Sequence, residues 1–305
     1  MKTSSQPAAV LLLIVCVFSW GSVFPIAKEV LQEMSGLSLV LWRFAIAVTC
    51  LALLVAASRP ARASLALWQH LVLALVGAVG IGGFNLGLFV GLAQSSATNG
   101  SLIMALSPLI TALMAALLAR RPLGGWQWLG LALGLIGVGL VLSQGDPARL
   151  WRLGIGRGDL ILFGAMLAWS GYTLCSQRLG HWLPPLPFTL YTMAAGGLAM
   201  VLFGLGQPDL HPWQELCALD AVGRLKVLYI GLFATVLGYL FWVGGVRALG
   251  AMRASLFINF VPVFAALVAW GLGQPLGAAQ LAGMAVVLAG LLLPRLAERR
   301  RGTVG

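Results

Sequence analysis

Arg43 is the first residue whose chemistry demands an explanation, because it is the one charged residue in the apolar stretch at 37–57. It lies about six residues from one end of that stretch, which is ~9 Å along a helix. A guanidinium fixed in apolar surroundings could bind the carboxylate of a small solute. Alternatively, its long side chain could reach outward to Glu29, Glu33 or loop carbonyls. We predict a binding role and keep the outward-reaching side chain as the alternative.

Trp20 and Trp169 form a second pair of candidates, 149 residues apart and each near the middle of an apolar stretch. A tryptophan at that depth can line a cavity, where its indole N–H finds a polar partner, or it can pack in a closed core. Tryptophans near the ends of stretches, such as Trp68 and Trp126, suit a membrane–water interface instead. We predict that Trp20 and Trp169 line a binding cavity.

Prolines interrupt three of the apolar stretches, at Pro25, Pro108 and Pro262. Proline removes a helix hydrogen bond and leaves the carbonyl four residues back without its donor. For Pro108 and Pro262 those carbonyls belong to Met104 and Ile258. Such carbonyls could bind a substrate ammonium at a helix break, or the prolines could serve packing alone. We predict that all three prolines break or gate helices.

Polar side chains within the apolar stretches complete the candidate binding set. Buried polar groups need partners, so they are expected to face the interior of the protein, either at a binding site or as contacts between helices. The predicted binding residues of this kind are Asn85, Tyr172, Tyr239 and Asn259.

Acidic residues and histidines, by contrast, do not lie deep in any stretch. General-base catalysis therefore has no candidate residue, and the chain is not expected to be an enzyme. The four cysteines have no metal-ligand spacing, so no metal and no cofactor is predicted. A proton-coupled transporter usually carries a buried carboxylate or histidine, so we expect any transport to be facilitative.

The elements that position these residues are membrane-spanning helices. The chain is 60% hydrophobic and 9% charged, whereas soluble domains carry about 25% charged residues. In lipid the backbone must satisfy its own hydrogen bonds, and long continuous apolar runs favour helices over a barrel. Ten runs approach the roughly 20 residues that a span needs. They lie at 8–28, 37–57, 68–93, 97–119, 126–143, 158–178, 186–206, 222–247, 251–272 and 278–296.

Charge placement predicts the orientation of these helices. With the N-terminus inside, twelve Lys and Arg residues fall on the cytoplasmic side and six on the other. This bias places both termini in the cytoplasm. Basic loops facing anionic lipid account for the net charge of +11 without a nucleic-acid partner.

The two halves of the chain repeat each other. Residues 122–130 align with 275–283 at an offset of 153, with five of nine positions identical. Five spans per half is an odd number, so the second copy must cross the membrane in the opposite sense. We predict two inverted five-helix repeats, at 8–143 and 158–296. Further repeat-related pairs are Trp20 with Trp169, Gly77 with Gly231, Asn85 with Tyr239, Gly91 with Gly245, and Pro108 with Pro262.

The chain resembles the drug/metabolite transporter superfamily, specifically its ten-helix EamA-type members, and is similar to YddG-type amino-acid exporters. The resemblance covers roughly residues 8–296. It rests on Phe18-Ser19-Trp20-Gly21, Arg43, Ser107-Pro108, Gly158-Asp159-Leu160, and Pro122 and Gln127 with Pro275 and Gln280. It implies a multi-pass transporter of the cell inner membrane that exports small organic solutes, often amino acids.

We therefore expect a transporter of small solutes, amino acids including aromatic ones above all, that works by alternating access. A carrier of other metabolites or drugs is the alternative, and an intramembrane enzyme is a further one. The expected partners are a small-molecule substrate, membrane lipids and a second copy of the chain. Gly87-x-x-x-Gly91 and Gly130-x-x-x-Gly134 would let helices approach closely, either within the fold or in such a dimer.

Overall fold

The computed structural model of the chain describes residues 6–59, 64–95, 103–143, 156–273 and 277–302, together with Gly100, Asp146 and Ala148. The described residues form helices and turns, without a strand. Seven helical segments are long and apolar enough to cross a membrane. Three shorter apolar helices complete the set of ten, at Ile103–Ala119, Gly125–Leu140 and Leu281–Gly290. The predicted all-α architecture is therefore confirmed.

The first half of the chain supplies five of these helical segments. α3, η1 and α4 follow one another without a gap and form one span. The bounds are α1 (Gln6–Val30), α2 (Gly36–Ser58), α3 (Leu67–Gly77), η1 (Ala78–Gly83), α4 (Phe84–Ala93), α6 (Ser107–Ala119) and α7 (Gly125–Ser143).

The second half has the same order of segments, with one addition. The short helix α11, which the sequence did not predict, lies between its second and third spans. The bounds are α9 (Arg157–Arg178), α10 (Pro185–Leu205), α11 (Pro212–Ala218), α12 (Ala221–Tyr229), η2 (Ile230–Leu237), α13 (Gly238–Leu249), α14 (Ala251–Ser255), η3 (Leu256–Asn259), α15 (Phe260–Gly271) and α16 (Ala278–Gly302).

Both halves depart from the α-helix at equivalent places. η1 and η2 are π-helical segments in the third span of each half. The fourth span is broken by a turn at Leu106 in the first half and by the 3-10 segment η3 in the second. Both breaks lie within the apolar stretches at 97–119 and 251–272, next to the prolines for which the sequence predicts an interruption. Residues 108 and 262 are prolines without an N–H, so the helix restarts around them.

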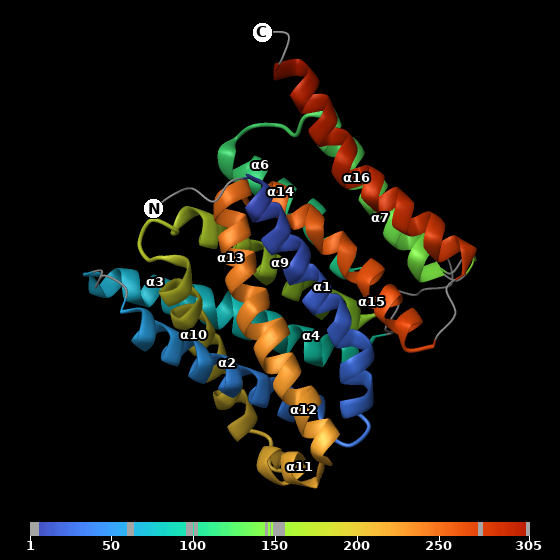
Figure 1. Cartoon of the computed structure of the whole chain (residues 1–305). Coiled ribbons are helices and arrows are strands. Elements are labelled where there is room, and N and C mark those ends of the chain that lie inside the picture. Colours follow the sequence, from blue (N-terminus) through green and yellow to red (C-terminus); the bar gives the residue numbers. More distant parts are fainter. Residues whose placement is uncertain are drawn as a thin grey trace.

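The packing of the helices follows the repeat. α4 packs on α9 as α13 packs on α1, and α6 packs on α9 as α15 packs on α1. η1 contacts α10 as η2 contacts α2, and α7 lies along α16 at one side of the bundle (Figure 1). Each of these contacts joins one half to the other. The halves therefore form one body, although the predicted repeat limits of 8–143 and 158–296 remain a prediction.

Glycines make the close approaches between the halves possible. A Cβ on Gly91 would lie 2.7 Å from Leu162, and a Cβ on Gly245 would lie 2.4 Å from the repeat-related Leu13. In the fifth span of each half, a Cβ on Gly137 would lie 2.7 Å from the carbonyl oxygen of Gly283. The glycine motifs seen in the sequence are thus used within the chain, at least in part, since Gly91 packs against α9.

The bundle has two ends, which we call upper and lower as they appear in Figure 1. α1 begins and α16 ends toward the upper end, while α1 ends beside α11 and α12 at the lower end (Figure 1). The charge bias of the sequence predicts that the upper end is cytoplasmic.

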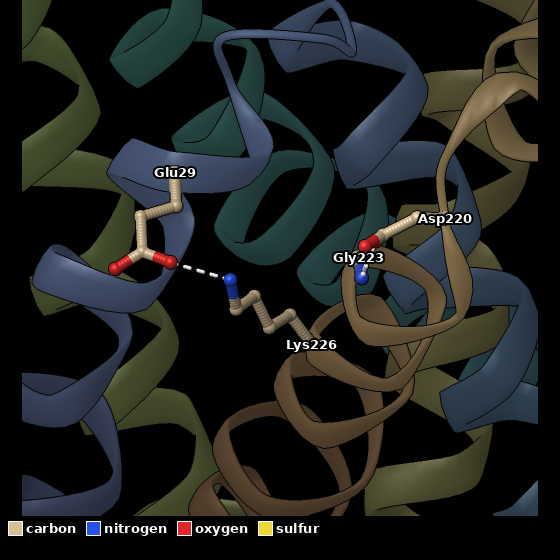
Figure 2. Close-up of polar contacts among 4 residues, drawn as sticks. All are labelled: Glu29, Asp220, Gly223 and Lys226. Atoms are coloured by element: carbon tan, nitrogen blue, oxygen red, sulfur yellow. Dashed lines mark hydrogen bonds and ion pairs between the residues drawn. The ribbon is translucent and has the colours of Figure 1, made fainter.

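Polar contacts tie the helices together at the lower end. Lys226 of α12 forms an ion pair with Glu29 of α1, and Asp220 caps α12 by accepting from the Gly223 N–H (Figure 2). Glu215 of α11 accepts from the Ser38 hydroxyl and the Ser35 N–H at the start of α2. Burial raises the pKa of Glu215, but these hydrogen bonds outweigh it and hold that pKa below its ordinary value.

The replacement Gly77→Ala tests the close packing between the halves. The added Cβ would lie 2.3 Å from the Thr192 carbonyl oxygen, so we expect a loss of about 1–3 kcal/mol in unfolding free energy. The matched control is Gly164→Ala, because a Cβ there would meet nothing within 4 Å. Thermal unfolding in detergent measures both variants. Equal melting temperatures for the two would contradict the packing described here.

Candidate functional site

A cavity of about 180 Å³ lies inside the bundle, between the two halves. Helices of both halves line it. The first half contributes α1, α2, α4 and its fourth span. The second half contributes α9, η2, α13 and its own fourth span, which includes η3 and α15. Its lining brings together five of the seven predicted binding residues. They are Trp20, Arg43, Asn85, Trp169 and Tyr239.

Aromatic rings form one wall of this cavity. The rings of Trp20 and Trp169 meet edge to face with centroids 5.4 Å apart. Tyr239 lies 5.9 Å from Trp20 and 5.7 Å from Trp169, and Trp242 lies 5.4 Å from both tryptophans. Edge-to-face and tilted contacts at these separations stabilise aromatic clusters. Because Trp20 and Trp169 are repeat equivalents in direct contact, the pseudo-two-fold axis passes between them.

The indole of Trp20 is held by a backbone irregularity. Its Nε1–H donates to the Ala234 carbonyl at 2.8 Å, and Ala234 lies within the π-segment η2. In a π-helix the hydrogen-bond ladder is displaced, which makes carbonyl oxygens accessible to side chains. The irregular segment therefore fixes the orientation of a cavity-lining ring.

Arg43 brings the only positive charge among the described residues that line the cavity. Its Nε is buried and has no hydrogen-bond partner in the protein. The guanidinium carbon lies 5.6 Å from the ring centroid of Phe44, and the head group interacts with the Tyr239 hydroxyl. Glu29, an alternative partner considered from the sequence, is paired with Lys226 instead. A buried guanidinium with a free N–H suits an anionic ligand.

Asn85 and Tyr239 extend this polar corner of the cavity. The Asn85 amide donates to the Ile81 carbonyl at 2.8 Å and reaches the Tyr239 hydroxyl at 3.5 Å. These two residues are repeat equivalents, so they lie on opposite sides of the same axis as the tryptophans. A chain of polar contacts thus runs from the Ile81 carbonyl through Asn85 to the Tyr239 hydroxyl, which interacts with the guanidinium of Arg43.

The two remaining predicted binding residues do not line the cavity. Tyr172 lies behind Trp169, with ring centroids 5.7 Å apart, and its hydroxyl lies 3.4 Å from Thr192 Oγ1. Asn259 faces α7, where its side-chain nitrogen would lie 2.2 Å from a Cβ on Gly134. We therefore place both outside the binding surface of this conformation.

The three prolines have different surroundings. Pro108 lies in the first turn of α6 and Pro262 in the first turn of α15, each just after a break in the helix. Met104 and Ile258, whose carbonyls lose their α-helical donor, both line the cavity. Pro25 lies inside α1, which continues past it to Val30.

Several residues of the site were not predicted as binding residues. Phe84 lines the cavity with its ring 5.2 Å from Trp169, and Ser107 places a buried hydroxyl there. The repeat could have pointed to Phe84, because its equivalent, Gly238, packs against Trp20. Nothing in the sequence distinguishes Trp242 from the other tryptophans of the chain. Its place beside the site is seen only in its ring contacts with Trp20 and Trp169.

The equivalent space in the upper half of the bundle is filled. Leu88 and Val23 line the cavity, whereas their repeat equivalents are the larger Trp242 and Tyr172. Trp242 is completely buried, and its Nε1–H donates to Thr173 Oγ1 at 3.3 Å. Tyr172 fills the space beside Gly80, where a Cβ would lie 2.6 Å from it. The structure is therefore packed above the aromatic wall and hollow below it.

No group of three His, Cys, Asp or Glu residues that could hold a metal ion occurs in the part of the chain that the structure describes. The cavity instead offers an apolar aromatic surface with one guanidinium, one amide and the hydroxyls of Ser107 and Tyr239. A hollow site between two inverted repeats of membrane-spanning helices is the architecture of secondary transporters. The fold and the site define a multi-pass membrane transporter.

Comparison with known proteins identifies the family. The model of the EamA-like transporter family matches residues 7–143 and again residues 156–295, so the chain belongs to this family. Uncharacterized transporter YyaM of Bacillus subtilis (strain 168) is 32% identical over 272 residues, which cover 89% of this chain and 88% of that protein. An uncharacterized transporter of Archaeoglobus fulgidus is 25% identical over 287 residues, covering 93% and 97%. A crystal structure superposes with a TM-score of 0.78 at 19% identity, covering 97% of this chain and 99% of that one, which supports the fold.

Proposed function

We propose that this transporter carries small amphipathic carboxylates, above all amino acids including aromatic ones. The observation that carries the proposal is the buried Nε of Arg43, which has no protein partner in a cavity walled by Trp20, Trp169 and Tyr239. A guanidinium binds a carboxylate with directed hydrogen bonds. Aromatic rings accept an apolar or aromatic side chain by stacking and dispersion.

The same cavity argues against strongly anionic substrates. A phosphorylated metabolite or nucleotide sugar carries two or more negative charges, and these need several cationic partners once they leave water. Arg43 is the only cation among the described lining residues. Other singly charged metabolites or drugs with an apolar body are the second candidate class, because they would fit the same surface.

We further propose that transport proceeds by alternating access, with net export across the cell inner membrane. Two inverted repeats can exchange conformations, so that the packed half opens as the hollow half closes. The contrast between Trp242 and Leu88 at equivalent positions supports a one-sided barrier above the cavity. Export and the inner-membrane location follow from the resemblance to amino-acid exporters, and a dimer of two chains stays a proposal.

Replacing Arg43 tests the proposed substrate contact. For Arg43→Ala we expect at least a tenfold loss of L-phenylalanine counterflow in proteoliposomes, because one charge-assisted hydrogen bond contributes about 1.5–3 kcal/mol. Arg43→Lys should retain part of the activity, since it keeps the charge but not the bidentate geometry. The control is Arg178→Ala, at an exposed position in the last turn of α9. Wild-type flux in Arg43→Ala would remove Arg43 from the site.

Replacing Trp242 tests the barrier in the upper half. Trp242→Leu copies the residue found at the equivalent lower position, so the upper half should open more often. The buried thiol of Cys16, which lies near Gly238 in this half, reports the opening through its rate of reaction with a maleimide. The other three cysteines are first changed to serine. We expect labelling to become several-fold faster, whereas Trp270→Leu, at an exposed position on α15, should leave the rate unchanged.

An unchanged Cys16 labelling rate in Trp242→Leu would contradict the barrier. Thermal unfolding serves as the parallel check that the variant remains folded, because truncating a buried tryptophan can itself remove several kcal/mol of stability.

A pH gradient tests facilitative transport. None of the described residues that line the cavity has a carboxylate or an imidazole that could carry a proton. With equal L-phenylalanine on both sides of a liposome, an imposed pH gradient should therefore cause no net accumulation. Uphill accumulation that an ionophore abolishes would show proton coupling and refute this part of the proposal.

A further inference from the structure

Ser107 presents the most unusual hydroxyl in the described part of the bundle. The residue is 1% exposed, and its Oγ is buried without a hydrogen-bond partner. It lines the same cavity as Arg43. Buried hydroxyls are nearly always hydrogen-bonded, so an unpartnered one beside a cavity points to a ligand.

Other serines in the spans show what Ser107 does not do. Ser19 donates to the Val15 carbonyl at 2.8 Å, and Ser255 donates to the Met252 carbonyl at 2.9 Å. This bond to the preceding turn is the usual way for a serine to satisfy itself in an apolar helix. Ser107 lies immediately after the turn at Leu106, where the helix is broken. The hydroxyl of Ser107 makes no hydrogen bond to the preceding turn.

The break also supplies a second acceptor. Pro108 has no N–H, so it cannot donate to the carbonyl of Met104, a residue three positions before Ser107 that also lines the cavity. A hydroxyl oxygen and a backbone carbonyl together form an acceptor pair suited to an ammonium group. Arg43, which has donors only, contributes the opposite polarity.

We infer that Ser107 is a specificity-determining residue that binds a donor group which the substrate carries in addition to its carboxylate, as an α-ammonium does. The inference rests on the proposed function, in which Arg43 binds the carboxylate. It goes further by assigning a separate contact to each charged end of the substrate. Arg43 binds the anionic carboxylate, and Ser107 together with the Met104 carbonyl binds the cationic ammonium group. The transporter would then prefer amino acids over otherwise identical carboxylic acids that lack the amino group.

Matched ligand pairs test this division. L-Phenylalanine is compared with 3-phenylpropionate, and L-leucine with 4-methylpentanoate, because each pair differs only in the amino group. Binding to the purified full-length protein in detergent is measured by the ligand-induced rise in melting temperature, which yields apparent Kd values. We expect wild type to bind each amino acid about tenfold more tightly than its analogue. In Ser107→Ala this ratio should fall to about one.

A control variant and a second readout keep the test decisive. Ser255→Ala removes a hydroxyl that is satisfied by its own helix, so it should keep the tenfold preference. Without ligand, Ser107→Ala should melt at the wild-type temperature or above, because it removes a polar atom that has no partner. A clearly lower melting temperature would mean that the hydroxyl has a structural role, which would overturn the inference.

The outcomes also separate this inference from the proposed function. If wild type binds both members of each pair equally, and Arg43→Ala weakens both, then Ser107 does not determine specificity while the carboxylate site stands. If Ser107→Ala keeps the preference for amino acids, the inference fails in the same way. If neither member of either pair binds to wild type, the proposed function fails together with the inference.

Discussion

The backbone of a membrane protein has no water to satisfy its hydrogen bonds, so each departure from the α-helix in a span has to be compensated. In this protein the departures occur in repeat-related pairs around one cavity. η2 offers the Ala234 carbonyl to Trp20, and η1 ends just before Phe84 and Asn85. The breaks before Pro108 and Pro262 bring Ser107 and Ile258 to the lining. The unusual backbone is therefore concentrated where a ligand would bind.

A symmetric scaffold with asymmetric side chains explains why the cavity lies on one side of the aromatic wall. The glycine contacts are equivalent in the two halves, as Gly91 with Leu162 and Gly245 with Leu13 demonstrate. The side chains that fill the space on the two sides of the aromatic wall are not equivalent, because the small Leu88 of one half corresponds to the large Trp242 of the other. An inverted repeat allows two conformations that the pseudo-two-fold axis exchanges. In the alternating access that we propose, the larger side chains favour the conformation that is packed in the upper half, and a substrate shifts that balance only by binding one conformation better.

Much of the scaffold could be predicted from the sequence, because span length, apolar composition and the repeat are simple one-dimensional signals. The repeat also identified Trp20 with Trp169 and Asn85 with Tyr239, which meet on the pseudo-two-fold axis. The π-segments could not be predicted, since they depend on which side chains and neighbouring helices take up the displaced backbone bonds. The contacts of Trp242 and the unpartnered hydroxyl of Ser107 could not be predicted for a similar reason, because burial and missing partners are properties of three-dimensional packing.

Solute exchange by the purified protein tests the central claim most directly. Proteoliposomes loaded with unlabelled amino acids, carboxylic acids or phosphorylated metabolites are given trace labelled compound outside, and counterflow is followed over time. Alternating access around a cavity with one guanidinium predicts saturable exchange of amphipathic amino acids, accelerated by unlabelled solute on the opposite side. Folded protein that exchanges only phosphorylated metabolites, or exchanges none of the solutes, would contradict it.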